Sequence, residues 1–160
     1  MGDTTPVDIQ ASTGSEPVEL WGRVINGFDV TNRRIQRAIQ RELSLNEAEA
    51  QVMLNLLRTP DRRAPMAKLA RASSFTTGGF TKLADKMARR GLVARAACDD
   101  DRRVTFLEFT PEGAKVADDL LRLVERINHE AFIDVLGEDR ARQVAQAMTE
   151  LFRANSEHAS

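Results

Sequence analysis

The chain has 160 residues, the length of about one domain. Hydrophobic residues make up 42% and charged residues 29%, which is the composition of a folded globular protein and excludes a disordered one. No run approaches the roughly 18 apolar residues that cross a bilayer, and residues 1–10 lack the basic start and apolar run of a secretory signal. We therefore expect a cytoplasmic protein without a membrane partner.

The sequence contains no arrangement of residues typical of catalysis. A single cysteine, Cys98, cannot form an intrachain disulfide or a structural zinc site. The two histidines, His129 and His158, have no partner motif for a metal site or a catalytic triad, and there is no glycine-rich phosphate-binding motif. We expect no enzymatic activity, no metal and no cofactor.

The net charge of −1 conceals an uneven distribution along the chain. Residues 58–103 hold twelve Lys and Arg against five Asp, a surplus of +7, whereas the remaining residues hold eleven basic and nineteen acidic side chains. One concentrated basic segment on an otherwise acidic body favours a surface that faces a polyanion. A solvated charged face is the alternative interpretation.

The N-terminal region is predicted to be a polar tail, residues 1–15, followed by a long helix within residues 16–43. Ser15 can cap this helix, which we expect to end near Arg41. The helix is indicated by apolar residues at helical spacing: Leu20, Val24, Phe28, Ile35 and Ile39.

A helix-turn-helix pattern comes next. Ser44 and Glu47 have the spacing of a capping box ahead of a second helix, which ends before Thr59-Pro60. A third helix is predicted over residues 65–71. After a four-residue turn, Thr76 or Thr77 begins a fourth helix, which continues to Arg90 before a left-handed Gly91.

The hydrophobic period then changes from helical to alternating. Residues 92–97 and 103–109 are β-favouring runs on either side of a charged tip, which predicts a β-hairpin, or wing, directly after the helix-turn-helix. Thr110 and Pro111 open a fifth helix that extends to about Val135. Gly137 separates it from a last amphipathic helix.

Three short motifs carry a resemblance to a known family. They are Arg90-Gly91-Leu92-Val93, Asp101-Arg102-Arg103, and the segment from Leu107 to Gly113 that contains Thr110. Their sequence and spacing are similar to the R-G-L-V, D-x-R and L-x-x-T-x-x-G signature of the MarR family of winged helix-turn-helix transcription regulators. The resemblance covers about residues 18–155.

The resemblance implies a mainly α fold with a small β-hairpin wing, and a homodimer whose N- and C-terminal helices intertwine. The implied organisation is a tail (1–15), a dimerisation helix (16–43), a winged DNA-binding lobe (44–110), C-terminal dimerisation helices (111–155) and a second tail (156–160). The apolar stripes of the terminal helices support the dimer independently, although they could instead close an intrachain core. Two-fold symmetry predicts a pseudo-palindromic operator with half-sites about 10 bp apart.

The fourth helix is the expected recognition helix. Its exposed face is predicted to contain Thr76, Thr77, Gly78, Thr81, Lys82, Asp85 and Lys86. Hydroxyl groups near its N-terminus can meet base edges or phosphates, and the lysines can contact phosphate or guanine. Gly78 and Gly79 each cost about 1 kcal/mol in a helix. Close approach of the DNA backbone and close packing on the third helix both explain them.

The wing is predicted to contact DNA through Arg102 and Arg103. By resemblance, Arg103 enters the minor groove and Asp101 helps to hold the hairpin. The acidic run from Asp99 to Asp101 departs from the more neutral tips of the family and supports an alternative function, a protein-interaction module that kept the fold but not DNA binding.

Family members commonly bind small aromatic or lipophilic molecules and release DNA in response. The matching region here would include Trp21, Val24, Phe28 and Met53, which a dimer core could equally use. We therefore expect a transcription regulator, more often a repressor in this family, that binds double-stranded DNA and a second copy of itself and responds to such an effector.

Overall fold

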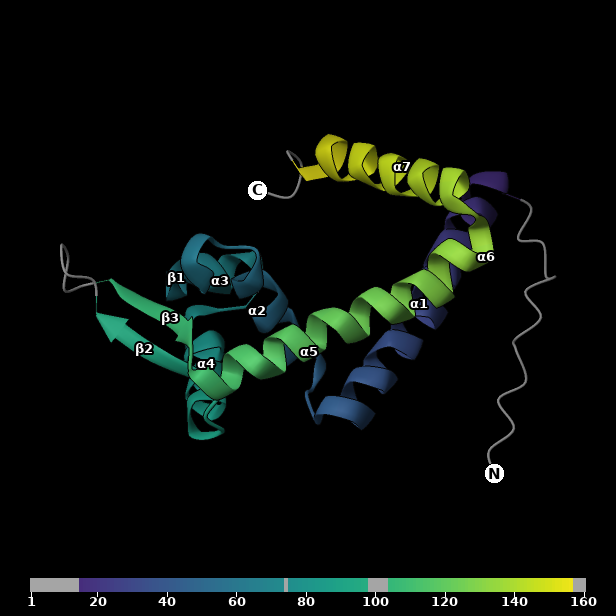
Figure 1. The fold of residues 1–160 in the computed structure, drawn as a ribbon. Coiled ribbons are helices and arrows are strands. Elements are labelled where there is room, and N and C mark those ends of the chain that lie inside the picture. The colour runs from purple at the N-terminus through teal and green to yellow at the C-terminus, as the bar shows by residue number, and fades with distance from the viewer. Residues whose placement is uncertain (1–14, 74, 98–103, 157–160) are drawn as a thin grey trace, which may run out of the picture.

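The computed structural model describes residues 15–73, 75–97 and 104–156. It has a lobe of short helices with a small sheet, joined to an arm of long helices (Figure 1). The elements are α1 (Glu16–Leu43), α2 (Glu47–Leu57), a 3-10 turn (Pro60–Arg62), β1 (Arg63–Pro65), α3 (Met66–Ala72), α4 (Thr77–Arg89), β2 (Val93–Ala97), β3 (Thr105–Phe109), α5 (Pro111–Asn128), a π-helical turn (His129–Ile133), α6 (Asp134–Leu136) and α7 (Glu138–Ser156).

The fold is mainly α-helical with a small antiparallel sheet, as expected. Strands β2 and β3 form the predicted hairpin, with Val93 opposite Phe109 and Ala97 opposite Thr105. A third strand, β1, pairs with the other edge of β3 and gives the order β1-β3-β2. The sequence did not indicate β1 because it has only three residues and ends in Pro65, which is tolerated at the edge of a sheet.

The capping box predicted at Ser44 and Glu47 is wrong. Helix α1 extends past Arg41 to Leu43, and Ser44 ends it in a left-handed conformation with φ of 54°. The capping box is formed two residues later, where the Glu49 amide donates to Asn46 Oδ1 over 2.9 Å and the Asn46 amide donates to Glu49 Oε2 over 3.0 Å. Both pairs of residues have the required spacing, so spacing alone could not choose between them.

The other helix ends follow the local signals more closely. Of the two threonines expected to begin α4, Thr76 is the cap. Thr110 caps α5 and Gly91 adopts a φ of 70°, both as predicted. Ser15 precedes α1 as expected, but its side chain makes no capping hydrogen bond. The helix predicted from Pro111 to about Val135 is interrupted by the π-helical turn. It ends before Gly137, which has a φ of 78°.

The hydrophobic core lies where the lobe meets the C-terminal half of α1 and helix α5. Its largest fully buried apolar side chains are Phe80, Ile39, Leu45, Met53, Leu56, Leu69, Met87, Leu107, Leu120 and Val52. By contrast, the N-terminal half of α1 and most of α7 lie outside this core. The lobe is therefore a packed unit, while in the described part of the chain the arm leaves large apolar side chains exposed.

Gly113 allows the start of α5 to pack against the backbone of Gly91 and Leu92, which follow α4. The Thr110 hydroxyl accepts from the Gly113 amide over 2.9 Å and donates to the Gly91 carbonyl. A Cβ atom on Gly113 would lie 1.7 Å from the carbonyl oxygen of Leu92, which is a backbone atom and cannot rotate away. The absence of a side chain at Gly113 thus sets the distance between α5 and the lobe.

We predict that Gly113→Ala lowers the free energy of unfolding by about 3 kcal/mol or more, because overpacking here must move backbone. Denaturant unfolding in the absence of DNA measures this change. The matched control is Gly78→Ala, since nothing lies within 4 Å of a Cβ there and alanine favours the helix. Equal stability of the two variants would contradict the role assigned to Gly113.

Candidate nucleic-acid interface

Helix α4 presents polar groups at its exposed N-terminus. The Thr76 hydroxyl accepts from the Gly79 amide over 3.2 Å, and the Thr81 hydroxyl donates to the Thr77 carbonyl over 2.9 Å. Thr77, Gly78 and Lys82 are exposed. Nothing lies within 4 Å of a Cβ built on Gly78, so packing against the third helix does not explain this glycine. Close approach of another molecule stays as its explanation.

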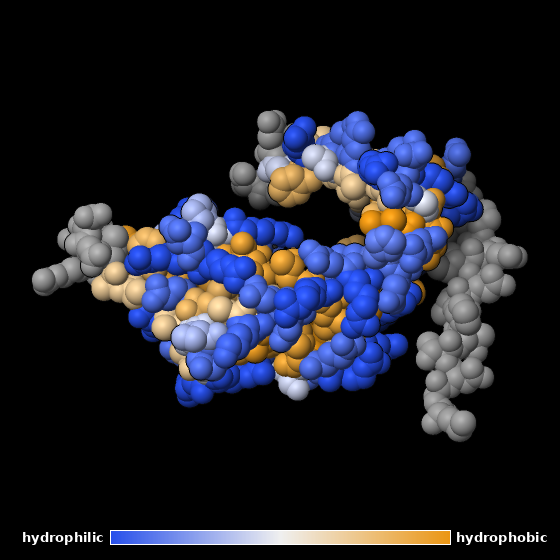
Figure 2. Space-filling model, in the orientation of Figure 1, coloured by the Kyte–Doolittle hydropathy of each residue, from blue (hydrophilic) through white to orange (hydrophobic). Residues whose placement is uncertain are grey.

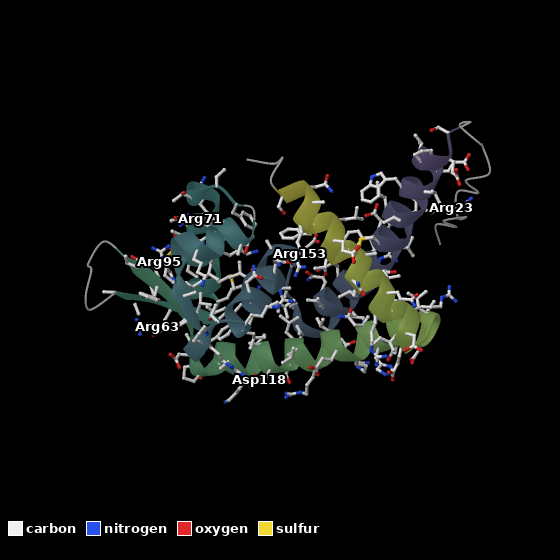
Figure 3. The ribbon with its side chains drawn as sticks, turned by 90° about the horizontal axis from the view of Figure 1, so that it is seen from above. Arg23, Arg63, Arg71, Arg95, Asp118 and Arg153 are labelled. Atoms are coloured by element: carbon white, nitrogen blue, oxygen red, sulfur yellow. The ribbon has the colours of Figure 1, made fainter. Side chains whose placement is uncertain are left out.

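A groove of about 650 Å³ runs between α3, α4 and the sheet. Lys68 and Arg71 of α3 line one side, Thr77 and Thr81 of α4 line another, and Arg95 of β2 closes it. Figure 3 shows Arg71 and Arg95 on the lobe, far from the arm of long helices. Basic side chains and hydroxyl groups around one groove fit a phosphate backbone.

Lys68, Arg71 and Arg95 were not singled out from the sequence. All three belong to the basic segment 58–103, which was the available signal. Its sequence could not show which of its cations would share one groove, because they come from two helices and a strand.

Arg95 also connects the sheet to the recognition helix. Its guanidinium lies 2.7 Å from Asp85 Oδ1 and donates to the Thr81 carbonyl over 3.4 Å. Asp85, expected on the exposed face of α4, is therefore paired with a cation. This pairing reduces its repulsion of an approaching phosphate and links β2 to α4.

Lys86 is paired with the carboxylate of Glu49. Its Nζ atom lies 3.2 Å from Glu49 Oε1, while Arg90 Nη1 lies 2.6 Å from Glu49 Oε2. A second nitrogen of Arg90 donates to the Ser44 carbonyl over 3.0 Å. Glu49 thus joins the last turn of α4 to the junction of α1 and α2.

Glu49 is the only charged side chain that is buried in the described part of the chain, with 1% exposure. Burial raises the pKa of its carboxyl group, but hydrogen bonds from the Asn46 amide, Arg90 and Lys86 outweigh that effect and lower the pKa below the ordinary value of 4.5. The carboxylate is therefore ionised at neutral pH, and its two cations are held in place.

The expected wing contacts, Arg102 and Arg103, and the expected support, Asp101, lie outside the described residues. The base of the wing is described. There the Arg63 guanidinium lies 4.4 Å from the centre of the Phe106 ring and 3.8 Å from Glu108. These contacts join β1 to β3 and anchor the hairpin to the lobe.

The residues expected around an effector are only partly brought together. Trp21, Val24 and Phe28 are 53%, 39% and 65% exposed on α1, whereas Met53 is fully buried in the lobe core. Exposed apolar side chains also occur on α7, and Figure 2 shows an open hollow between α7 and the lobe with apolar atoms at its inner end. Met53 therefore does not share a surface with the other three.

The described residues also bear on other kinds of function. Within that part of the chain, no group of three or more His, Cys, Asp or Glu side chains is arranged to hold a metal ion. None of the helices described there has the length and apolar character needed to cross a membrane.

We predict that Glu49→Gln lowers the free energy of unfolding by about 2 kcal/mol, because hydrogen bonds to charged groups of Arg90 and Lys86 lose their ionised acceptor. The pKa of Glu49 is lowered by folding, so its stabilising effect is present above pH 4.5 and is lost as the pH falls through the lowered value. Denaturant unfolding of both proteins from pH 3 to 7, at roughly one-unit steps, measures this dependence.

The control for this substitution is Glu47→Gln, which removes an exposed carboxylate from the same first turn of α2. It should cost well under 1 kcal/mol. A difference between wild type and Glu49→Gln that did not shrink in acid would show that the carboxylate charge is not what stabilises the lobe.

The lobe is similar to proteins of one known family. Residues 43–104 match the model of the MarR family. A segment of 69 residues is 33% identical to the HTH-type transcriptional repressor YetL of Bacillus subtilis (strain 168), covering 43% of this chain and 41% of that protein. The match therefore spans about two fifths of the length of this curated relative.

Solved structures share the fold over most of the chain. The MarR family transcriptional regulator Sco3205 from Streptomyces coelicolor, solved in complex with DNA, superposes with a TM-score of 0.75 at 21% identity, covering 86% of this chain and 84% of that one. NadR, solved in complex with 4-hydroxyphenylacetate, superposes with a TM-score of 0.66 at 20% identity over 80% of this chain and 88% of that one. At this identity the likeness shows the fold alone, a winged helix-turn-helix lobe joined to long helices.

Proposed function

We propose that this chain, whose residues 43–104 match the model of the MarR family, is a sequence-specific DNA-binding regulator of transcription. The observation that carries the proposal is the basic groove between α3, α4 and β2. Sco3205, which shares the fold, was solved with DNA, and YetL is described as a repressor. We accordingly favour repression as the sign of regulation.

The groove suits a phosphate backbone next to a major groove. Lys68 and Arg71 supply cations on one side, and the N-terminus of α4 offers Thr76, Thr77 and a glycine without a side chain at position 78. Lys82 is exposed on the same helix. The helix N-terminus also favours an anion through its dipole. In the proposed complex, α4 enters the major groove while α3 contacts phosphates.

Lys86 has a smaller part in this proposal than its sequence position suggested. It is half exposed, but its amine is paired with Glu49. We assign it to positioning α4, with Lys82 and Thr81 as the contacts from the middle of the helix. We propose that Arg103 enters the minor groove of the DNA and that Arg102 is a second DNA contact. Asp101 is proposed to hold the hairpin of the wing.

The proposed DNA-binding form is a homodimer. Large apolar side chains of α1 are exposed, among them Leu20, Trp21 and Phe28, and Phe152 of α7 is 74% exposed. Monomers rarely leave such contiguous apolar surface in water, and a second copy of the same arm can cover it. Two-fold symmetry then places two lobes on half-sites about 10 bp apart.

We also propose an effector site on the α1 arm. Trp21, Val24 and Phe28 provide aromatic and aliphatic surface there, and NadR, which shares the fold, was solved with 4-hydroxyphenylacetate. A small aromatic or lipophilic molecule that prefers one spacing of the two lobes would change DNA affinity by its difference in affinity for the two forms. Buried Met53 is left out of this site.

We predict that Arg71→Ala weakens binding to a fluorescent duplex about tenfold, the duplex being taken from upstream of the gene that encodes this chain. The salt slope should fall by about two, because one phosphate contact is lost from each subunit of the dimer. Fluorescence anisotropy at several salt concentrations measures both effects. Arg103→Ala should weaken binding in the same way.

The control is Arg23→Ala, which removes the same charge from the arm, far from Arg71 in Figure 3. It should leave DNA affinity within about twofold. If the folded wild-type protein bound neither this duplex nor an unrelated one at low salt, the alternative function as a protein-interaction module would replace DNA binding.

We predict that Phe152→Glu converts the dimer into monomers, because a charge would be buried in an apolar interface. Sedimentation velocity measures the oligomeric state. Arg153→Ala, one residue further along α7, should leave the dimer intact. Monomeric wild-type protein at micromolar concentration would contradict the proposed dimer.

A further inference from the structure

A second basic surface lies outside the DNA-binding lobe. A groove of about 570 Å³ runs between the C-terminal half of α1 and the end of α5. Its lining includes five guanidinium groups, from Arg33, Arg34, Arg37, Arg41 and Arg126. None of these arginines belongs to the basic segment 58–103, so the proposed DNA contacts do not account for them.

The three residues Arg33, Arg37 and Arg41 are spaced four apart on α1 and therefore lie along one stripe of the helix. Arg126 faces them from α5. Its guanidinium is held 3.0 Å from Glu42. Arg34 lies 2.9 Å from Glu130 of the π-helical turn. Two ion pairs thus join α1 to the second wall of the groove. Within α1, Arg41 lies 3.1 Å from Glu42.

Arg33 and Arg37 lie on the same stripe of α1 and are exposed. Across the described ranges 15–73, 75–97 and 104–156, neither makes a salt bridge within 4.0 Å. The floor beneath them is apolar and includes Val30, Ala38 and Ile127. Two guanidiniums therefore face solvent above a hydrophobic floor.

The groove keeps an excess of positive charge when no anion is bound. Five guanidiniums surround it, and three of them are paired: Arg34 with Glu130, and Arg41 and Arg126 with Glu42. Like charges at neighbouring positions of a helix repel each other. Outside residues 58–103 the chain is otherwise acidic, with nineteen Asp and Glu against eleven Lys and Arg, so this positive field is local. A bound anion would relieve the repulsion.

We propose that the groove between α1 and α5 binds a phosphorylated small molecule of nucleotide size. Arginine forks bind phosphate oxygens in pairs, and Arg33 and Arg37 present two such forks one helical turn apart. The volume of about 570 Å³ is that of a small-molecule site. The apolar floor would cover a ring or an aliphatic part of the ligand. This site is separate from the proposed DNA and aromatic effector surfaces.

The test uses the full-length protein, with inorganic pyrophosphate and ADP as probes in isothermal titration calorimetry at fixed ionic strength. We expect saturable binding of both, tighter for ADP because it adds a ring. Arg33→Ala/Arg37→Ala should weaken binding at least tenfold. The matched control, Arg23→Ala/Arg153→Ala, removes the same charge from labelled positions on the arm in Figure 3 and should leave the dissociation constant within twofold.

Three outcomes would overturn the proposal. They are the absence of saturable binding to wild-type protein, an equal loss in the control variant, and a loss of duplex affinity in Arg33→Ala/Arg37→Ala with binding of both probes unchanged. The last outcome would assign the stripe to DNA phosphates instead. Because the titration contains no DNA, its result is independent of whether the DNA-binding proposal holds.

Discussion

The buried carboxylate of Glu49 is the interaction on which the lobe's geometry depends. It completes the capping box of α2 and accepts from Arg90 at the end of α4, while Arg90 also reaches the Ser44 carbonyl at the end of α1. Three helices therefore meet at one ionised group. An uncompensated charge in this position would be costly, so the helices are held in the one arrangement that satisfies it.

This cluster explains how the recognition helix can be both exposed and rigid. Its N-terminal half faces solvent with hydroxyls, a lysine and Gly78, whereas its C-terminal half is fixed by Lys86 and Arg90. The pair between Arg95 and Asp85 fixes the middle of the helix to β2. A helix that must present several groups to DNA at once gains from such support, since less ordering is needed on binding.

The sequence predicted those features that depend on neighbouring residues. Thr76, Thr110 and Gly91 act locally, and their roles in the structure are as expected. The capping box was misplaced because two overlapping pairs satisfy the same spacing. Strand β1 was missed because three residues at a sheet edge carry no periodic signal. No local pattern shows which cations line the groove between α3, α4 and the sheet. The same holds for the pairing of Arg126 with Glu42, which are 84 residues apart, because both depend on tertiary packing.

Helix α1 connects the surfaces proposed here. Its N-terminal half has the exposed apolar side chains, its C-terminal half has the arginine groove, and its end at Ser44 accepts from Arg90 of the recognition segment. A molecule bound in the groove would contact both α1 and α5, the two helices that join the arm to the lobe. If that molecule and DNA each prefer one angle between these helices, the two binding events are coupled. The molecule then changes the affinity for DNA by the same factor as DNA changes the affinity for the molecule.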